Sequence, residues 1–206
     1  MDAKKILTNV GGPLLVIVGL FFLAIGLKDV YMGFFEKGPE SQEVRVKQAL
    51  GAAKEFVEYT DETTGVSLQY PKEWTKEAII GGTEFKTLDG VVNVRTTLDD
   101  LSKEKEKITP ERYRELMKKQ LGDLEEKAQM KYTTIAEGTT TIQNFPAYQW
   151  TYTLKVRELL IGGAQAWFVK DGKVVVLTYT TPSQLFDPFY PTFQQMVQSV
   201  RLNEKK

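Results

Sequence analysis

The amino-acid sequence predicts an α+β protein in which an antiparallel β-sheet is flanked by helices, an α/β/α sandwich, preceded by one transmembrane helix. The residues from Ile6 to Leu27 carry no charge and suffice to cross a bilayer core, which needs about 20 residues in a helix. Between residues 56 and 181, short segments alternate apolar and polar residues and are separated by turn residues, as antiparallel strands do. Residues 110–124 and 189–200 instead carry apolar side chains at helical spacing, so helices are expected to cover the sheet.

Composition restricts the function more by what it lacks than by what it contains. The 206 residues allow one domain and an anchor, and 27 basic against 27 acidic residues give a net charge of zero, so nucleic acid is not an expected partner. There is no Cys, which excludes disulfides and thiol chemistry, and no His, the commonest general base and metal ligand. We therefore expect no enzyme, no cofactor and no metal site.

The chain is expected to divide into four parts: residues 1–37, a cytoplasmic stub with the membrane helix; 38–55, a linker; 56–202, the soluble domain; and 203–206, a tail. The alternative to an anchor is a cleaved secretory signal, whose apolar region is about 7 to 15 residues long. The apolar run here is longer, and bulky residues follow Leu27 where a signal peptide has small ones. A retained membrane anchor, in contact with lipid, is therefore expected.

The charges that flank the span predict its orientation. Lys4 and Lys5 precede it, whereas acidic residues outnumber lysines in the segment that follows it. By the positive-inside rule the N-terminus is cytoplasmic and the domain is extracytoplasmic, in a periplasm, a lumen or the cell exterior.

Glycine recurs every seventh residue of this segment and so occupies one slowly drifting stripe of a helix. A stripe of small residues lets a second helix approach closely in lipid, although glycine is also common in membrane helices and no GxxxG is present. The expected helix-packing interface is Gly12, Gly19, Gly26 and Gly33.

The soluble domain begins with two predicted hairpins. Residues 57–61 and 66–70 flank the turn 62–65, and Pro71 ends the second strand. Residues 84–88 and 91–98 flank Asp89-Gly90, a strong hairpin signal. A helix follows, with Thr109 as its cap and Pro110 at its first position. Its apolar stripe is Tyr113, Leu116, Met117, Leu121 and Leu124.

The second half of the domain is predicted to contain four strands and a final helix. The strands are residues 132–142, 148–156, 159–169 and 173–181, and Lys170-Asp171-Gly172 joins the last two. The helix is indicated by apolar residues that recur at helical spacing up to the end of the domain. Its stripe is Phe189, Phe193, Met196, Val197 and Val200.

Three segments carry a resemblance to a known family. Gly65–Trp74 reads GVSLQYPKEW, Phe85–Leu98 forms the hairpin described above, and Val174–Leu202 combines the closing strand with an aromatic helix. Together they resemble PsbP-like domains over residues 56–202. The resemblance implies an α/β/α sandwich around an antiparallel sheet and a non-enzymatic role. The family's namesake is a lumenal extrinsic subunit of photosystem II that supports the oxygen-evolving site, and relatives are assembly factors or uncharacterised envelope proteins. The membrane helix departs from the namesake, which has a cleaved targeting peptide, so none of its functional residues is carried over.

Few residues suggest chemistry. Asp89, Asp99 and Asp100 offer oxygens to a Ca²⁺ ion, but Asp is common in turns and the spacing is not that of an EF-hand. Ser183 and Ser199 have no His to activate them. The pairs Gly81-Gly82 and Gly162-Gly163 lack the phosphate-loop context and are expected to be bulges or hinges.

The aromatic segment Pro182–Phe193 is the main candidate for a protein interface. If Pro188 and Pro191 interrupt the helix, its rings cannot all face one core, and an exposed aromatic cluster suits a protein partner. The alternative, which the sequence favours, is that most of them lie under the sheet. The candidate interface residues are Phe186, Phe189 and Tyr190.

Two functions of different classes remain after these observations. The first is a non-enzymatic, membrane-anchored accessory or scaffold subunit that docks on a larger membrane protein complex, photosynthetic or respiratory, from the extracytoplasmic side. The second is an envelope-exposed module whose sheet binds a small ligand or an ion.

Overall fold

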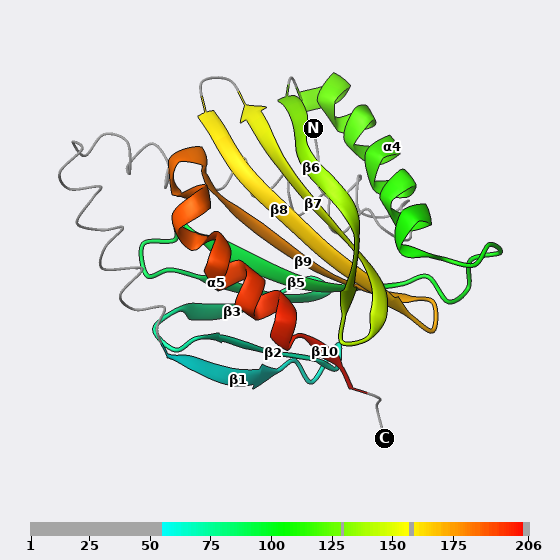
Figure 1. Cartoon of the computed structure of the whole chain (residues 1–206), viewed down its shortest axis with the longest axis horizontal. Coiled ribbons are helices and arrows are strands. Elements are labelled where there is room, and N and C mark those ends of the chain that lie inside the picture. The colour runs from blue at the N-terminus through cyan, green and yellow to red at the C-terminus, as the bar shows by residue number, and fades with distance from the viewer. Residues whose placement is uncertain (1–54, 129, 157–158, 204–206) are drawn as a thin grey trace.

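The computed structural model describes residues 55–128, 130–156 and 159–203 (Figure 1). The predicted membrane helix, its four glycines and nearly all of the linker lie outside these residues. Among the helices that are described, none has both the length and the apolar composition that a membrane crossing requires.

Ten strands, two α-helices and one short 3-10 helix, η1, make up the described chain. In chain order they are β1 (Phe56–Thr60), β2 (Val66–Pro71), β3 (Thr75–Ile79), β4 (Gly82–Lys86), β5 (Asn93–Asp100), α4 (Pro110–Ala128), β6 (Met130–Ile142), β7 (Phe145–Val156), β8 (Leu159–Lys170), β9 (Lys173–Pro182), η1 (Ser183–Leu185), α5 (Phe186–Ser199) and β10 (Arg201–Leu202).

The strands form two antiparallel sheets. The large sheet has seven strands in the order β3-β4-β5-β9-β8-β7-β6, and the small sheet has three in the order β1-β2-β10. Helix α4 contacts β6, β7 and β8, whereas α5 contacts β2, β8 and β9 and so lies between the two sheets (Figure 1). The prediction of antiparallel strands flanked by helices is confirmed. The prediction of a single sheet is wrong, because the first hairpin joins the C-terminal β10 instead of the main sheet.

Local turn signals predict the hairpins well where the turn is tight. Gly65 closes the β1–β2 turn with φ 76°, and Asp61 accepts hydrogen bonds from the backbone N–H of Thr63 (2.8 Å) and Thr64 (3.2 Å). Asp171 and Gly172 join β8 to β9 with φ 52° and 75°, as a two-residue hairpin turn with two positive φ angles requires.

The region between residues 72 and 92 departs from the prediction. Strand β3 was not expected, because most of its side chains are exposed and no apolar residues alternate along it. Asp89-Gly90 is not a two-residue turn: β4 ends at Lys86, β5 begins at Asn93, and residues 87–92 form a longer loop. Thr87 closes this loop, since its N–H donates to the carbonyl of Val92 over 3.0 Å.

Helix α4 begins as predicted and covers an aromatic cluster. The Thr109 hydroxyl accepts a 3.2 Å hydrogen bond from the N–H of Arg112, as an N-cap does. Tyr113 and Met117 are fully buried against Trp150 and Trp167 of the sheet. The Trp167 indole donates a 3.0 Å hydrogen bond to the Pro110 carbonyl, which fixes the start of the helix on the sheet.

Gly162 and Gly163 are regular residues of β8, so the prediction of a bulge or hinge at this pair is wrong. A Cβ atom at Gly162 would lie 2.8 Å from the Phe186 ring, and one at Gly163 would lie 2.4 Å from the Tyr152 ring. The absence of side chains lets one aromatic ring contact the strand on each face.

Helix α5 completes the core between the sheets. It continues through Pro188 and Pro191, so these prolines do not interrupt it. Phe193 and Met196 are fully buried and belong to the same cluster as Val66 and Leu68 of β2.

Candidate functional site

The three aspartates considered as calcium ligands are not brought together. Asp89 lies in the loop before β5, where its Oδ1 accepts hydrogen bonds from the Thr87 hydroxyl (2.7 Å) and the Val91 N–H (3.2 Å). Asp99 and Asp100 lie at the other end of β5. Among the described residues no three Asp, Glu, His or Cys side chains are grouped so that they could hold a metal ion.

Asp99 and Asp100 point to opposite faces of the sheet, and their pKa values are shifted in opposite directions. Asp100 accepts hydrogen bonds from the Ser102 N–H and hydroxyl, which lower its pKa. Asp99 is 3% exposed, and burial raises its pKa even though the Tyr113 hydroxyl donates a 2.6 Å hydrogen bond to Oδ2. Its Oδ1 is buried and has no hydrogen-bond partner in the part of the chain that the structure describes. This carboxyl group carries a cost in stability that its hydrogen bond only partly offsets.

The predicted aromatic interface is divided by the structure. Phe189 is 1% exposed and lies in the core, so its prediction as an interface residue is wrong: the uninterrupted helix turns it toward the sheets. Phe186 and Tyr190 remain partly exposed and stack with ring centroids 5.1 Å apart.

Phe186 and Tyr190 line a groove of about 460 Å³ between α5 and the strands β6 and β7. The Gln149 side chain donates a 2.8 Å hydrogen bond to the Tyr190 hydroxyl across this α5 groove. Its other wall is the threonine-rich middle of β6, including Thr139 and Thr140. The groove thus combines two aromatic rings with hydroxyl groups.

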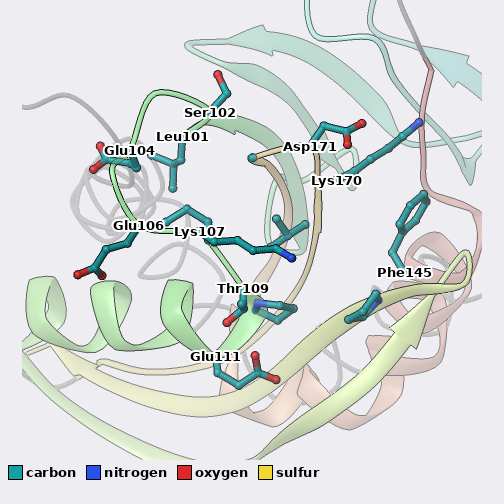
Figure 2. Close-up of a pocket in the computed structure, with 15 residues that line it drawn as sticks. Leu101, Ser102, Glu104, Glu106, Lys107, Thr109, Glu111, Phe145, Lys170 and Asp171 are labelled. Atoms are coloured by element: carbon teal, nitrogen blue, oxygen red, sulfur yellow. The ribbon is translucent and has the colours of Figure 1, made fainter.

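A larger pocket, of about 670 Å³, lies beside the β8–β9 turn (Figure 2), on the side of the domain away from the first turn of α5 (Figure 1). Three connections meet there: residues 101–109 before α4, the β6–β7 turn and the β8–β9 turn. The Leu101 N–H donates a 2.9 Å hydrogen bond to the Gly172 carbonyl, which holds the first connection against the third. We call this the loop-end pocket.

The loop-end pocket has charged side chains around partly apolar walls. Figure 2 shows Lys107 extending across it, while Glu104 and Glu106 point away. Its hydroxyl groups are already engaged, since Thr109 caps α4 and the Ser102 hydroxyl donates to Asp100 over 2.6 Å. The described lining therefore offers surfaces for binding and no nucleophile beside a base.

Sequence reasoning did not find the loop-end pocket. Residues 102–107 have the sequence SKEKEK, which gives no sign of a pocket, and each of them is exposed. The pocket arises because this loop is brought beside two turns that are distant in sequence.

The comparison with protein families decides the identity. The family described as PsbP-like protein matches residues 16–201, which include most of the uncharged N-terminal segment and nearly all of the described domain. The chain belongs to the PsbP-like family. The resemblance read from the strand and helix motifs is thereby confirmed, and the match begins 40 residues earlier than the motifs indicated, at 16 instead of 56.

A solved structure agrees with this assignment at the level of the fold. Cyanobacterial PsbP (CyanoP) from Synechocystis sp. PCC 6803 is 15% identical, with a TM-score of 0.58 over 74% of this chain and 94% of that chain. LpqN of Mycobacterium tuberculosis, described as involved in cell envelope biogenesis, is 14% identical, with a TM-score of 0.49 over 73% of this chain and 91% of that chain. None of the curated proteins matches this chain.

Proposed function

We propose that this PsbP-like protein is a non-enzymatic accessory subunit that docks on a larger membrane protein complex. In this proposal the uncharged segment Ile6–Leu27 anchors the chain, and residues 56–202 contact the complex from the extracytoplasmic side. The observation that carries it is the extent of the family match, which runs from residue 16 to residue 201 and treats most of the apolar segment and the domain as one unit.

The surface of the domain supports binding over catalysis. The loop-end pocket and the α5 groove both offer hydrogen-bonding groups beside apolar or aromatic walls. Interfaces between proteins are built from such mixtures of aromatic and polar groups. The whole sequence lacks His and Cys, so the usual pairs of a nucleophile with a histidine base cannot form.

Co-purification tests the proposal. A C-terminally tagged full chain, extracted from its native membrane with a mild detergent, should bring a defined set of membrane subunits in constant proportion. Extraction with sodium carbonate should leave the chain in the membrane pellet. A chain that purifies alone under several detergents, or that carbonate releases, would contradict the proposal.

The second candidate, a small-ligand module, is favoured by one observation. The loop-end pocket, at about 670 Å³, falls within the range of roughly 300 to 1,000 Å³ typical of small-molecule sites. Mass spectrometry of the purified full chain under native and denaturing conditions distinguishes the two. A small molecule retained by the native protein and lost in a Lys107→Glu variant would favour this candidate.

A further inference from the structure

One end of the large sheet lies where the described chain begins. The Glu55 carbonyl accepts a 2.9 Å hydrogen bond from the N–H of Lys72, just before β3. Thr75 of β3 pairs with Lys86 of β4, which leads directly into the loop 87–92. Figure 1 shows the start of β1 and the first turn of α5 on the same side, away from the β8–β9 turn. We call this the linker end.

The strand register places the beginning of β8 at the linker end as well. Asn93 of β5 pairs with Thr180 of β9, and Thr180 pairs with Gly163 of β8. Residues that precede Gly163 in β8 therefore lie beyond the start of β5, on the side of the loop 87–92.

Two exposed leucines occur at the linker end. Leu88, in the loop 87–92, is 81% exposed, and Leu160, the second residue of β8, is 44% exposed. Leu88 projects from a braced loop, because the Gly90 N–H donates to the Thr87 carbonyl (2.8 Å) and the Thr87 hydroxyl donates to Asp89 (2.7 Å). The braced loop backbone presents the apolar surface of Leu88 to water and lowers the cost of ordering the loop when this side chain meets an apolar phase.

Two lysines lie beside Leu160. Lys131 of β6 pairs with Lys155 of β7, and Lys155 pairs with Leu160, so the three side chains form one row on one face. Both lysines are exposed, and neither forms an ion pair with any described residue. Like charges directly opposite each other in a sheet are unfavourable, and a surface of negative charge would remove that repulsion.

We infer that the linker end of the domain rests on an anionic lipid surface, with Leu88 and Leu160 entering the interface and Lys131 and Lys155 meeting the headgroups. This rests on the proposed membrane anchoring. The 27 residues between Leu27 and Glu55 are long enough to span about 90 Å if fully extended, so their length alone does not fix the orientation of the domain. Contacts of the domain itself then set its orientation, and apolar side chains flanked by lysines fit the anionic interface of a bilayer.

Because the chain has no Cys, a single introduced cysteine reports on one position. Leu88→Cys and Ile80→Cys form a matched pair: Ile80 is 70% exposed and precedes β4, whereas Leu88 follows it, so the two lie at opposite ends of this strand. Each full-length variant is labelled at its cysteine with an environment-sensitive dye. It is then inserted into vesicles of phosphatidylcholine and phosphatidylglycerol that also contain spin-labelled lipid.

The dye at Leu88 should shift to the blue and be quenched by the spin-labelled lipid several-fold more than the dye at Ile80. Leu160→Cys is the second reporter should Leu88→Cys fold poorly, and it should behave like Leu88. Equal exposure of both ends to water, or stronger quenching at Ile80, would overturn the inference.

The lysines are tested by charge removal. The double variant Lys131→Gln with Lys155→Gln should dock less. Each substitution should lower the equilibrium constant between the docked and undocked domain on the order of fivefold. Lys103→Gln with Lys105→Gln, in the exposed loop at the other end of β5, should leave it unchanged. Vesicles of phosphatidylcholine alone should give the same loss, and undiminished quenching there would overturn the anionic partner.

Carbonate extraction of the same samples separates the two proposals. A chain that carbonate releases from the vesicles contradicts the membrane anchor itself. A chain that stays in the pellet while Leu88 is as exposed to water as Ile80 contradicts only the orientation inferred here.

Discussion

The Tyr113 hydroxyl of α4 donates a 2.6 Å hydrogen bond to the Asp99 carboxylate at the end of β5, and both side chains are buried. Burial and the neighbouring carboxylate raise the pKa of Tyr113 well above its usual value, so this residue is a neutral donor at physiological pH. The pair joins the helix to β5, a strand outside the three that α4 mainly contacts. The contribution of this hydrogen bond to stability depends on the charge of the Asp99 carboxylate, which is unfavourable to bury.

Removal of residues 1–37 should leave a monomeric, folded domain, because the described core is complete in itself: its two apolar clusters are formed by residues 55–203. Size-exclusion chromatography with light scattering and circular dichroism check this. Aggregation of the fragment 38–206, or loss of its sheet signal, would contradict the boundary between linker and domain.

Tyr113→Phe should destabilise this fragment by about 1 to 3 kcal/mol, since it removes the one hydrogen bond that the described side chains donate to this buried carboxylate while preserving the ring. Urea denaturation at neutral pH measures the change in the free energy of unfolding. A value within about 0.5 kcal/mol of zero, the scatter of neutral surface changes, would mean that water reaches Asp99.

Asp99→Asn should stabilise the fragment at neutral pH, and the gain should vanish in acid. The pKa of Asp99 is raised in the folded state, so the folded chain binds the proton more tightly than the unfolded chain does. Stability therefore falls as the pH rises from the ordinary value of 3.8 through the folded-state pKa, and the loss is complete above it. Urea midpoints from about pH 4 to 7 test this, and a constant difference between variant and wild type would contradict it.

Gly163→Ala should cost about 1 to 3 kcal/mol, because the new methyl group would lie 2.4 Å from the Tyr152 ring and the ring must move. Gly138→Ala in β6 is the matched control: nothing lies within 4 Å of its Cβ position, so that variant should be as stable as the wild type or slightly more stable. Thermal denaturation of both fragments compares them. Equal losses would indicate a backbone effect instead of a collision with the ring.

Gly19→Leu with Gly26→Leu tests the predicted helix-packing stripe in the membrane. Leucine favours the bilayer, so the chain should still insert, but its larger side chains should prevent close approach of a partner helix. The full-length variant should stay in the membrane fraction and lose its co-purifying subunits. Unchanged co-purification would mean that the segment is only a tether and that the domain makes the specific contacts.

Most signals that act over a few residues were read correctly from the sequence, although Asp89-Gly90 did not form the expected two-residue turn. The Thr109-Pro110 start of α4, the Gly65 turn and the Asp171-Gly172 hairpin depend on φ angles and hydrogen bonds within one turn of chain. The α5 stripe was equally clear, because every buried residue of a helix recurs at 3.6-residue spacing. Strand β3 was missed because apolar and polar side chains do not alternate along this exposed edge strand.

The tertiary structure alone decided which residues are neighbours. Helical spacing places Phe189 on the buried face of α5, but only the packing of α5 against both sheets shows that Phe186 and Tyr190 border a groove. Gly162 and Gly163 look like a hinge in sequence and are close-contact positions in space, because the rings that lie against them come from other elements. The loop-end pocket is made by three connections far apart in the chain. Such sites depend on contacts between residues far apart in the chain, and no short sequence pattern reveals these contacts.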